Sequence, residues 1–152
     1  MDREVFVREI EPCFDLMYRV AYAILQNEED SKDAMQESAI KAWEKRYTLR
    51  DIQKFKTWII IIVKNTCYNL IRKRKRIVSL EAIQEPSIPP PDPILSIALH
   101  NIPEKYRLPL MLSCSEGLTY REISEVLHVP STTVCGRIRL AKELLRKELN
   151  LE

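Results

Sequence analysis

The feature that most constrains this chain is the stretch of residues 55–76, which reads FKTWIIIIVKNTCYNLIRKRKR. Its first half is apolar, and it ends in five consecutive cations at residues 72–76. Neither Gly nor Pro interrupts it, so it predicts one continuous helix. Residues 52–80 hold eight Lys and Arg and no acid, although the whole chain carries a formal net charge of only +2. The positive charge is therefore concentrated in this segment.

The apolar residues of this stretch recur at helical spacing and predict a buried stripe. Its two rows are Trp58, Ile62, Thr66 and Leu70, and Ile59, Val63, Cys67 and Ile71. The residues expected on the remaining face are Lys64, Asn65, Tyr68, Asn69 and Arg72. Cations suit phosphates, amides suit base edges and a ring suits base stacking, so this face fits a nucleic acid. For such a run alone, a core helix with a solvated basic end is the commoner alternative.

Composition favours a helical protein that does not enter a membrane. The chain has only two Gly, and 45% of its 152 residues are hydrophobic, which is enough to build a core. Its longest apolar run, residues 58–63, is far shorter than the roughly 20 residues that span a bilayer. The charged N-terminus lacks the apolar core of a signal peptide, so we expect a cytoplasmic protein. The four cysteines lack paired spacing, and we expect reduced thiols without a metal.

The residues before the basic stretch predict two amphipathic helices. The first covers residues 2–26 with an early break near Pro12. The second is expected from about residue 32 to residue 45, with Asp30 or Ser31 as its cap. Its inner side is expected to contain Ala34, Ser38 and residues 40–43, and its outer side Asp33, Gln36, Glu37 and Lys41. An exposed acidic and amide face of this kind is most often only solvated. Residues 47–54 are expected to form a loop.

A proline-rich segment divides the chain. Residues 86–93, PSIPPPDP, contain five prolines in eight positions, which excludes a helix interior and favours an extended, semi-stiff connection. We therefore predict an all-α protein of two small helical domains, residues 1–78 and 95–152, joined by a linker over residues 79–94. The two domains are expected to move relative to one another.

The apolar spacing and the breaks of the second domain predict a four-helix unit that contains a helix-turn-helix. A short helix near residues 95–99 precedes one over residues 103–116, and Gly117 is a natural stop. Thr119 and Glu122 have the spacing of a capping box. A break at residues 128–130 then leads to a last helix, which Ser131 is expected to cap. A plain helical hairpin would show similar periodicity.

The order of these modules resembles the extracytoplasmic-function group of bacterial RNA polymerase sigma factors, and the likeness covers nearly the whole chain. DAMQESAIKAW at residues 33–43 resembles the helix that binds core polymerase, and residues 55–76 resemble the helix that melts and reads the minus-ten promoter element. Residues 102–147 resemble the reader of the minus-thirty-five element. Departures from the family pattern are Ala39, Ile60, Ile61, Asn69, Ser124, His128, Cys135, Gly136 and Leu140. His128 is expected in a left-handed conformation where Gly is usual.

The outward helix faces and the resemblance together predict three sets of binding residues and no catalytic or metal-binding residue. The core-polymerase set is Asp33, Gln36 and Glu37. The minus-ten set is Lys64, Asn65, Tyr68, Asn69, Arg72, Lys73, Arg74 and Arg76. The minus-thirty-five set is Ser131, Thr132, Thr133, Cys135, Arg137, Arg139 and Lys142. Implied partners are core RNA polymerase, promoter DNA and an anti-sigma factor, without a cofactor or direct membrane insertion.

Two other functions compete with that of a sigma factor. A helix-turn-helix regulator with a helical sensor domain explains the C-terminal half, but not an acidic helix next to a basic one. An enzyme has little support, because His100 and His128 lack partners at ligand or triad spacing and no glycine-rich phosphate loop is present. Promoter binding that depends on polymerase would separate the sigma factor from an ordinary regulator.

Overall fold

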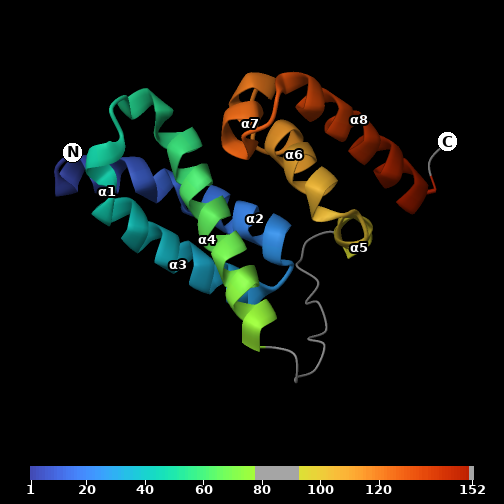
Figure 1. The fold of residues 1–152 in the computed structure, drawn as a ribbon, viewed down its shortest axis with the longest axis horizontal. Helices are drawn as coiled ribbons and strands as arrows, with labels where there is room; N and C mark the ends of the chain where they lie inside the picture. The colour runs from blue at the N-terminus through green and yellow to red at the C-terminus, as the bar shows by residue number, and fades with distance from the viewer. Residues whose placement is uncertain (78–92, 151–152) are drawn as a thin grey trace. The chain divides into compact units, whose positions relative to one another are not determined.

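The computed structural model describes residues 1–77 and 93–150, apart from the side chains of Arg76, Ile77 and Pro93 (Figure 1). All regular structure in this part of the chain is helical, which confirms the all-α prediction. The chain divides into two compact units, Met1–Glu85 and Pro86–Glu152. Most of the predicted linker lies outside the described residues, and helix α5 begins at Pro93, inside the range assigned to the linker.

The first unit opens with a helix that is interrupted where Pro12 predicts a break. Helix α1 (Arg3–Ile10) is capped by the carboxylate of Asp2, which accepts a 2.9 Å hydrogen bond from the backbone N–H of Val5. A single 3₁₀ turn, η1 (Glu11–Cys13), holds Pro12 and leads into α2 (Phe14–Leu25). Proline fits there because an N-terminal helical position needs no backbone N–H.

Helix α3 (Glu28–Glu44) begins earlier than predicted. The Asn27 side chain, and not Asp30 or Ser31, provides the cap, because its Oδ1 accepts a 2.9 Å hydrogen bond from the N–H of Asp30. Gln26, in the left-handed region at φ 53°, ends α2 just before this cap. The capping prediction was wrong because Asn27, Asp30 and Ser31 can all serve as caps, and the turn geometry selects among them.

Helix α4 (Phe55–Ile77) packs against both α2 and α3, which buries a wider arc than one stripe (Figure 1). The stripe prediction is confirmed for Ile59, Val63, Thr66 and Cys67. It was wrong for Trp58, Ile62, Leu70 and Ile71, which are only half-buried. Ile60 and Lys64 are buried instead. The turns η2 (Arg46–Thr48) and η3 (Ile52–Lys54) form the connection between α3 and α4.

The second unit contains α5 (Pro93–His100), α6 (Glu104–Cys114), α7 (Tyr120–Leu127) and α8 (Ser131–Glu148). The predicted capping box is present at the start of α7, with Thr119 and Glu122 exchanging hydrogen bonds of 3.0 and 3.1 Å. His128 lies in the left-handed region at φ 55°, as predicted. Ser131 does not cap α8, because the extended Pro130 precedes it and Ser131 is already helical. No described helix is long and apolar enough to cross a membrane.

Candidate nucleic-acid interface

The outer face of α3 combines polar side chains with one exposed apolar side chain. Asp33 and Gln36 are exposed, and the partly exposed Glu37 pairs with Lys41 at 3.2 Å. Ile40 was expected on the inner side, but it is 60% exposed. Positions 33, 36, 37 and 40 follow the i, i+3, i+4, i+7 spacing of a single helix face. This α3 face therefore offers a partner both charge and an apolar contact.

The outer face of α4 carries four of the five side chains that were predicted for it. Asn65 and Arg72 are exposed, and Tyr68 and Asn69 are half-buried. The guanidinium of Arg72 donates a hydrogen bond to Oδ1 of Asn69, so the two side chains are held together. Lys64 is only 5% exposed, and its assignment to this face was wrong. Packing of α4 against two helices takes up the side of the helix on which Lys64 lies.

The basic end of α4 differs from the prediction at Arg74. Both terminal nitrogens of its guanidinium donate to the carboxylate of Asp30, at the start of α3. Asp30 raises the pKa of Arg74, mainly through this hydrogen bond, and the charges of Asp33 and Glu29 act in the same direction. Arg74 is therefore occupied within the first unit. Lys73 and Lys75 are exposed, whereas the side chain of Arg76 lies outside the described residues.

A row of aromatic rings anchors the connection between α3 and α4. Phe6 lies between Trp43 and Phe55, with ring centroids 5.3 and 6.2 Å away, and Phe55 contacts Trp58 at 5.4 Å. The guanidinium of Arg46 lies 3.7 Å from the centre of the Trp43 ring. Anchored in this way, the connection leaves Tyr47 78% exposed. The sequence predicted a loop over residues 47–54, but no periodic pattern identified Tyr47 itself as exposed.

The start of α8 presents the side chains predicted to meet a DNA groove. Ser131, Thr132, Arg139 and Lys142 are exposed, whereas Thr133, Cys135 and Arg137 are half-buried. Nε of Arg137 is buried without a hydrogen-bond partner. Gly136 is exposed, and a Cβ built there would meet no atom within 4 Å. The helix therefore offers two exposed cations and two exposed hydroxyl groups. Between them, Gly136 leaves a gap where no side chain projects.

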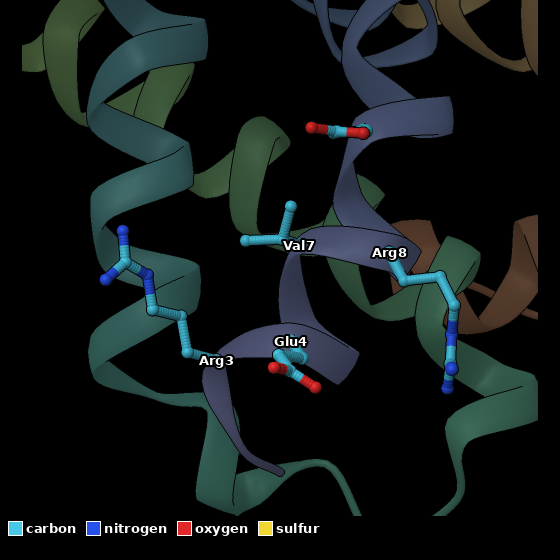
Figure 2. Close-up of a pocket in the computed structure, with 5 residues that line it drawn as sticks. Arg3, Glu4, Val7 and Arg8 are labelled. Atoms are coloured by element: carbon cyan, nitrogen blue, oxygen red, sulfur yellow. The ribbon is translucent and has the colours of Figure 1, made fainter.

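A shallow hollow on α1 is a different kind of surface. Figure 2 shows Arg3 and Arg8 extending in opposite directions on either side of Val7. Glu4 and Glu11 complete its lining, so charges of both signs alternate along α1 and the start of η1. A second hollow is lined by Arg3, Phe6, Val7 and Trp43, where α1 meets the last turn of α3. Mixed charges on a single helix suit a solvated surface.

Comparisons with known proteins place both units in one family. The family model for sigma-70 region 2 matches residues 10–77, and the model for sigma-70 region 4 matches residues 95–145. The ECF RNA polymerase sigma factor SigW of Bacillus subtilis is 30% identical over 97% of this chain and 90% of its own length. The chain belongs to the extracytoplasmic-function sigma factors of the sigma-70 family. As such, this sigma factor binds core RNA polymerase and directs promoter recognition and transcription initiation.

Further relatives agree with this membership. SigV of Bacillus subtilis is 30% identical, over 89% of this sigma factor and 85% of SigV. Among solved structures, the sigma factor RpoE from Bartonella quintana, in complex with the anti-sigma factor NepR, has a TM-score of 0.88 and 20% identity, covering 97% of this chain and 98% of RpoE. CnrH, in complex with the cytosolic domain of CnrY, has a TM-score of 0.74 and 19% identity, covering 98% and 90%. These two structures share the fold of the sigma factor.

Proposed function

We propose that three separate surfaces divide the work of initiation. The α3 face binds core polymerase, the outer face and basic end of α4 contact the minus-ten element, and the start of α8 contacts the minus-thirty-five element. The observation that carries this proposal is that Asp33 and Gln36 are exposed on α3 while Asn65 and Arg72 are exposed on α4. Because the two helices pack against each other, polymerase and DNA can bind neighbouring faces of one rigid unit.

The polymerase contact is assigned to Asp33, Gln36 and Glu37. The pairing of Glu37 with Lys41 leaves the exposed Asp33 carboxylate as the stronger attraction for a basic partner. The combined change Asp33→Lys and Glu37→Lys should abolish holoenzyme formation, measured by co-purification with core polymerase, without unfolding the chain. The matched control reverses two exposed acids outside this face, Glu4→Lys in α1 and Glu11→Lys in η1. Unchanged affinity of the α3 variant would remove this assignment.

The minus-ten contact is assigned to Asn65, Tyr68, Asn69 and Arg72, with Lys73 and Lys75 on phosphates. The half-buried Tyr68 and the exposed Tyr47 offer rings for bases of the melted strand. Lys64 is left out because it is buried, and Arg74 because Asp30 holds it. Footprinting of the holoenzyme with permanganate, which reacts with unpaired thymines, should show weaker melting for Asn65→Ala than for the wild type.

The minus-thirty-five contact is assigned to Ser131, Thr132 and Cys135 for bases and to Arg139 and Lys142 for phosphates. A recognition helix reads bases through its first turns and is held by flanking cations. Thr133 and Arg137 are half-buried and contribute less. Cys135 lacks the bidentate contact that Arg makes with guanine, which forfeits about 1–3 kcal/mol of discrimination. The second unit should therefore bind DNA weakly and prefer an unusual minus-thirty-five sequence.

Regulation by an anti-sigma factor is part of the proposal. RpoE, which shares the fold, was solved in complex with such a partner. We place the sigma factor in the cytoplasm, with core polymerase and DNA, and we assign it no catalytic reaction of its own. A pull-down from the native cell tests both partners. Recovery of polymerase subunits supports the contact with core polymerase, and recovery of a further protein that displaces those subunits supports an anti-sigma factor.

A further inference from the structure

The ion pair of Asp30 and Arg74 joins the start of α3 to the end of α4, which run alongside each other (Figure 1). The pair is bidentate, because each terminal nitrogen of Arg74 faces its own oxygen of Asp30. Asp30 is 8% exposed, while the side chain of Arg74 is 48% exposed. A planar guanidinium held at two points fixes orientation as well as distance, which a Lys ammonium cannot do.

The carboxylate of Asp30 is not needed to cap its own helix. Asn27 performs that function, since its side chain accepts from the N–H of Asp30 and its carbonyl accepts a 2.6 Å bond from the hydroxyl of Ser31. Asp30 lies in an acidic first turn with Glu28 and Glu29, both of which are exposed. Its side chain is therefore available for the bond to α4.

The end of α4 needs such a restraint. Cations three and four residues apart on a helix repel one another, and the last turn of a helix frays where its carbonyls lack partners. Arg74 lies between the exposed Lys73 and Lys75. A fixed Arg74 sets the rotation of these last turns, so its two neighbours project to either side of the α3 contact. Arg72, two residues before Arg74, is held separately by its bond to Asn69.

We propose that Asp30 orients the promoter-binding end of α4 by holding Arg74, and that Arg74 is a positioning residue and not a phosphate ligand. The inference rests on the proposed contact between this end of α4 and promoter DNA. A phosphate that took over both terminal nitrogens of Arg74 would break the pair and leave the carboxylate of Asp30 buried without its partner. That carboxylate would also repel the phosphate.

The two roles of Arg74 predict opposite results for Asp30→Asn. The measurement is binding and initiation by holoenzyme, assembled from the full chain and core polymerase, on a promoter duplex that wild-type holoenzyme selects from a randomised pool. As a positioning residue, Arg74 loses its restraint, and promoter affinity should fall about tenfold while core affinity stays unchanged. As a phosphate ligand, Arg74 would be released, and promoter affinity would stay the same or rise. The second result overturns the proposal.

Arg74→Lys provides a milder test that keeps the charge. A lysine is a competent phosphate ligand but cannot form the bidentate pair. Positioning predicts a loss similar to that of Asp30→Asn, whereas wild-type affinity would contradict it. Exchanging the partners, Asp30→Arg with Arg74→Asp, should recover part of the lost affinity, which a simple loss of folding would not allow. Thermal unfolding is followed for every variant.

Two matched controls separate this inference from the function it rests on. Glu29→Gln removes the neighbouring exposed charge without removing the pair, and it should bind the promoter like the wild type. Lys73→Ala with Lys75→Ala should lower the salt dependence of promoter binding. If that double variant has no effect, the proposed DNA contact fails, and the positioning role fails with it. If it has an effect and Asp30→Asn has none, only the positioning role fails.

Discussion

The hydroxyl of Ser124 donates a 2.5 Å hydrogen bond to the carbonyl oxygen of Val129, across the turn between α7 and α8. In the same turn, the backbone N–H groups of His128 and Val129 return to the carbonyl of Ser124. His128 is thereby held at φ 55° and ψ 44°, a conformation that costs a residue with a side chain roughly 1–2 kcal/mol. The helix-turn-helix angle is thus maintained without the glycine that is usual at this position.

Replacing His128 with Gly should stabilise the second unit. Relief of the left-handed strain is partly offset by the greater freedom of Gly in the unfolded chain, so we expect a gain of about 1 kcal/mol in the free energy of unfolding. Chemical denaturation of the full chain measures this change in the free energy of unfolding. The control Glu125→Gly, at an exposed position inside α7, should instead lose about 1 kcal/mol. An equal loss for both variants would show that His128 carries no strain.

Replacing Ile40 with Ser should weaken holoenzyme formation. Ile40 is 60% exposed on the α3 face, so its removal should change stability little, whereas a central apolar contact in an interface is often worth about 2 kcal/mol or more. The affinity for core polymerase should therefore fall, with an unchanged melting temperature. Val7→Ser, at an exposed apolar position of α1, is the control. Equal core affinities for the two variants would count against the interface role of Ile40.

Replacing Gly136 with Ala should separate stability from DNA binding. Because nothing lies within 4 Å of the added Cβ, α8 should gain roughly 1 kcal/mol from the higher helix propensity of Ala. If the gap at Gly136 lets the backbone approach DNA, the same change should weaken binding to the minus-thirty-five element. Denaturation and binding are measured on the same preparation. Improved stability with unchanged binding would mean that the gap faces no DNA.

Replacing Arg139 with Ala should weaken promoter binding about equally for different minus-thirty-five sequences. The exposed Arg139 is assigned to a phosphate, and the loss of one such contact should reduce the slope of log affinity against log salt by about 1. Arg146→Ala, in the last turn of the same helix, serves as the comparison and should change the slope less. A loss confined to one promoter sequence would indicate that Arg139 reads a base.

Features that depend on neighbouring residues along the chain could be predicted from the sequence. The helices, the break at Pro12, the capping box of Thr119 and Glu122, and the left-handed His128 all follow from contacts within about one helical turn. The order of the modules was also sufficient to identify the family, since each motif is a continuous segment.

Tertiary structure alone decided which side of each helix meets the core. Lys64 and Ile40 exchanged their expected environments because α4 is buried against two helices and α3 leaves Ile40 outside that contact. The pair of Asp30 and Arg74 joins residues that are 44 positions apart, so no local pattern of charge could show it. Periodicity predicts that a helix has a buried and an exposed face. The rotation of the helix about its own axis, however, depends on the shapes of its neighbours. This rotation decides whether a cation on the helix meets DNA or a carboxylate.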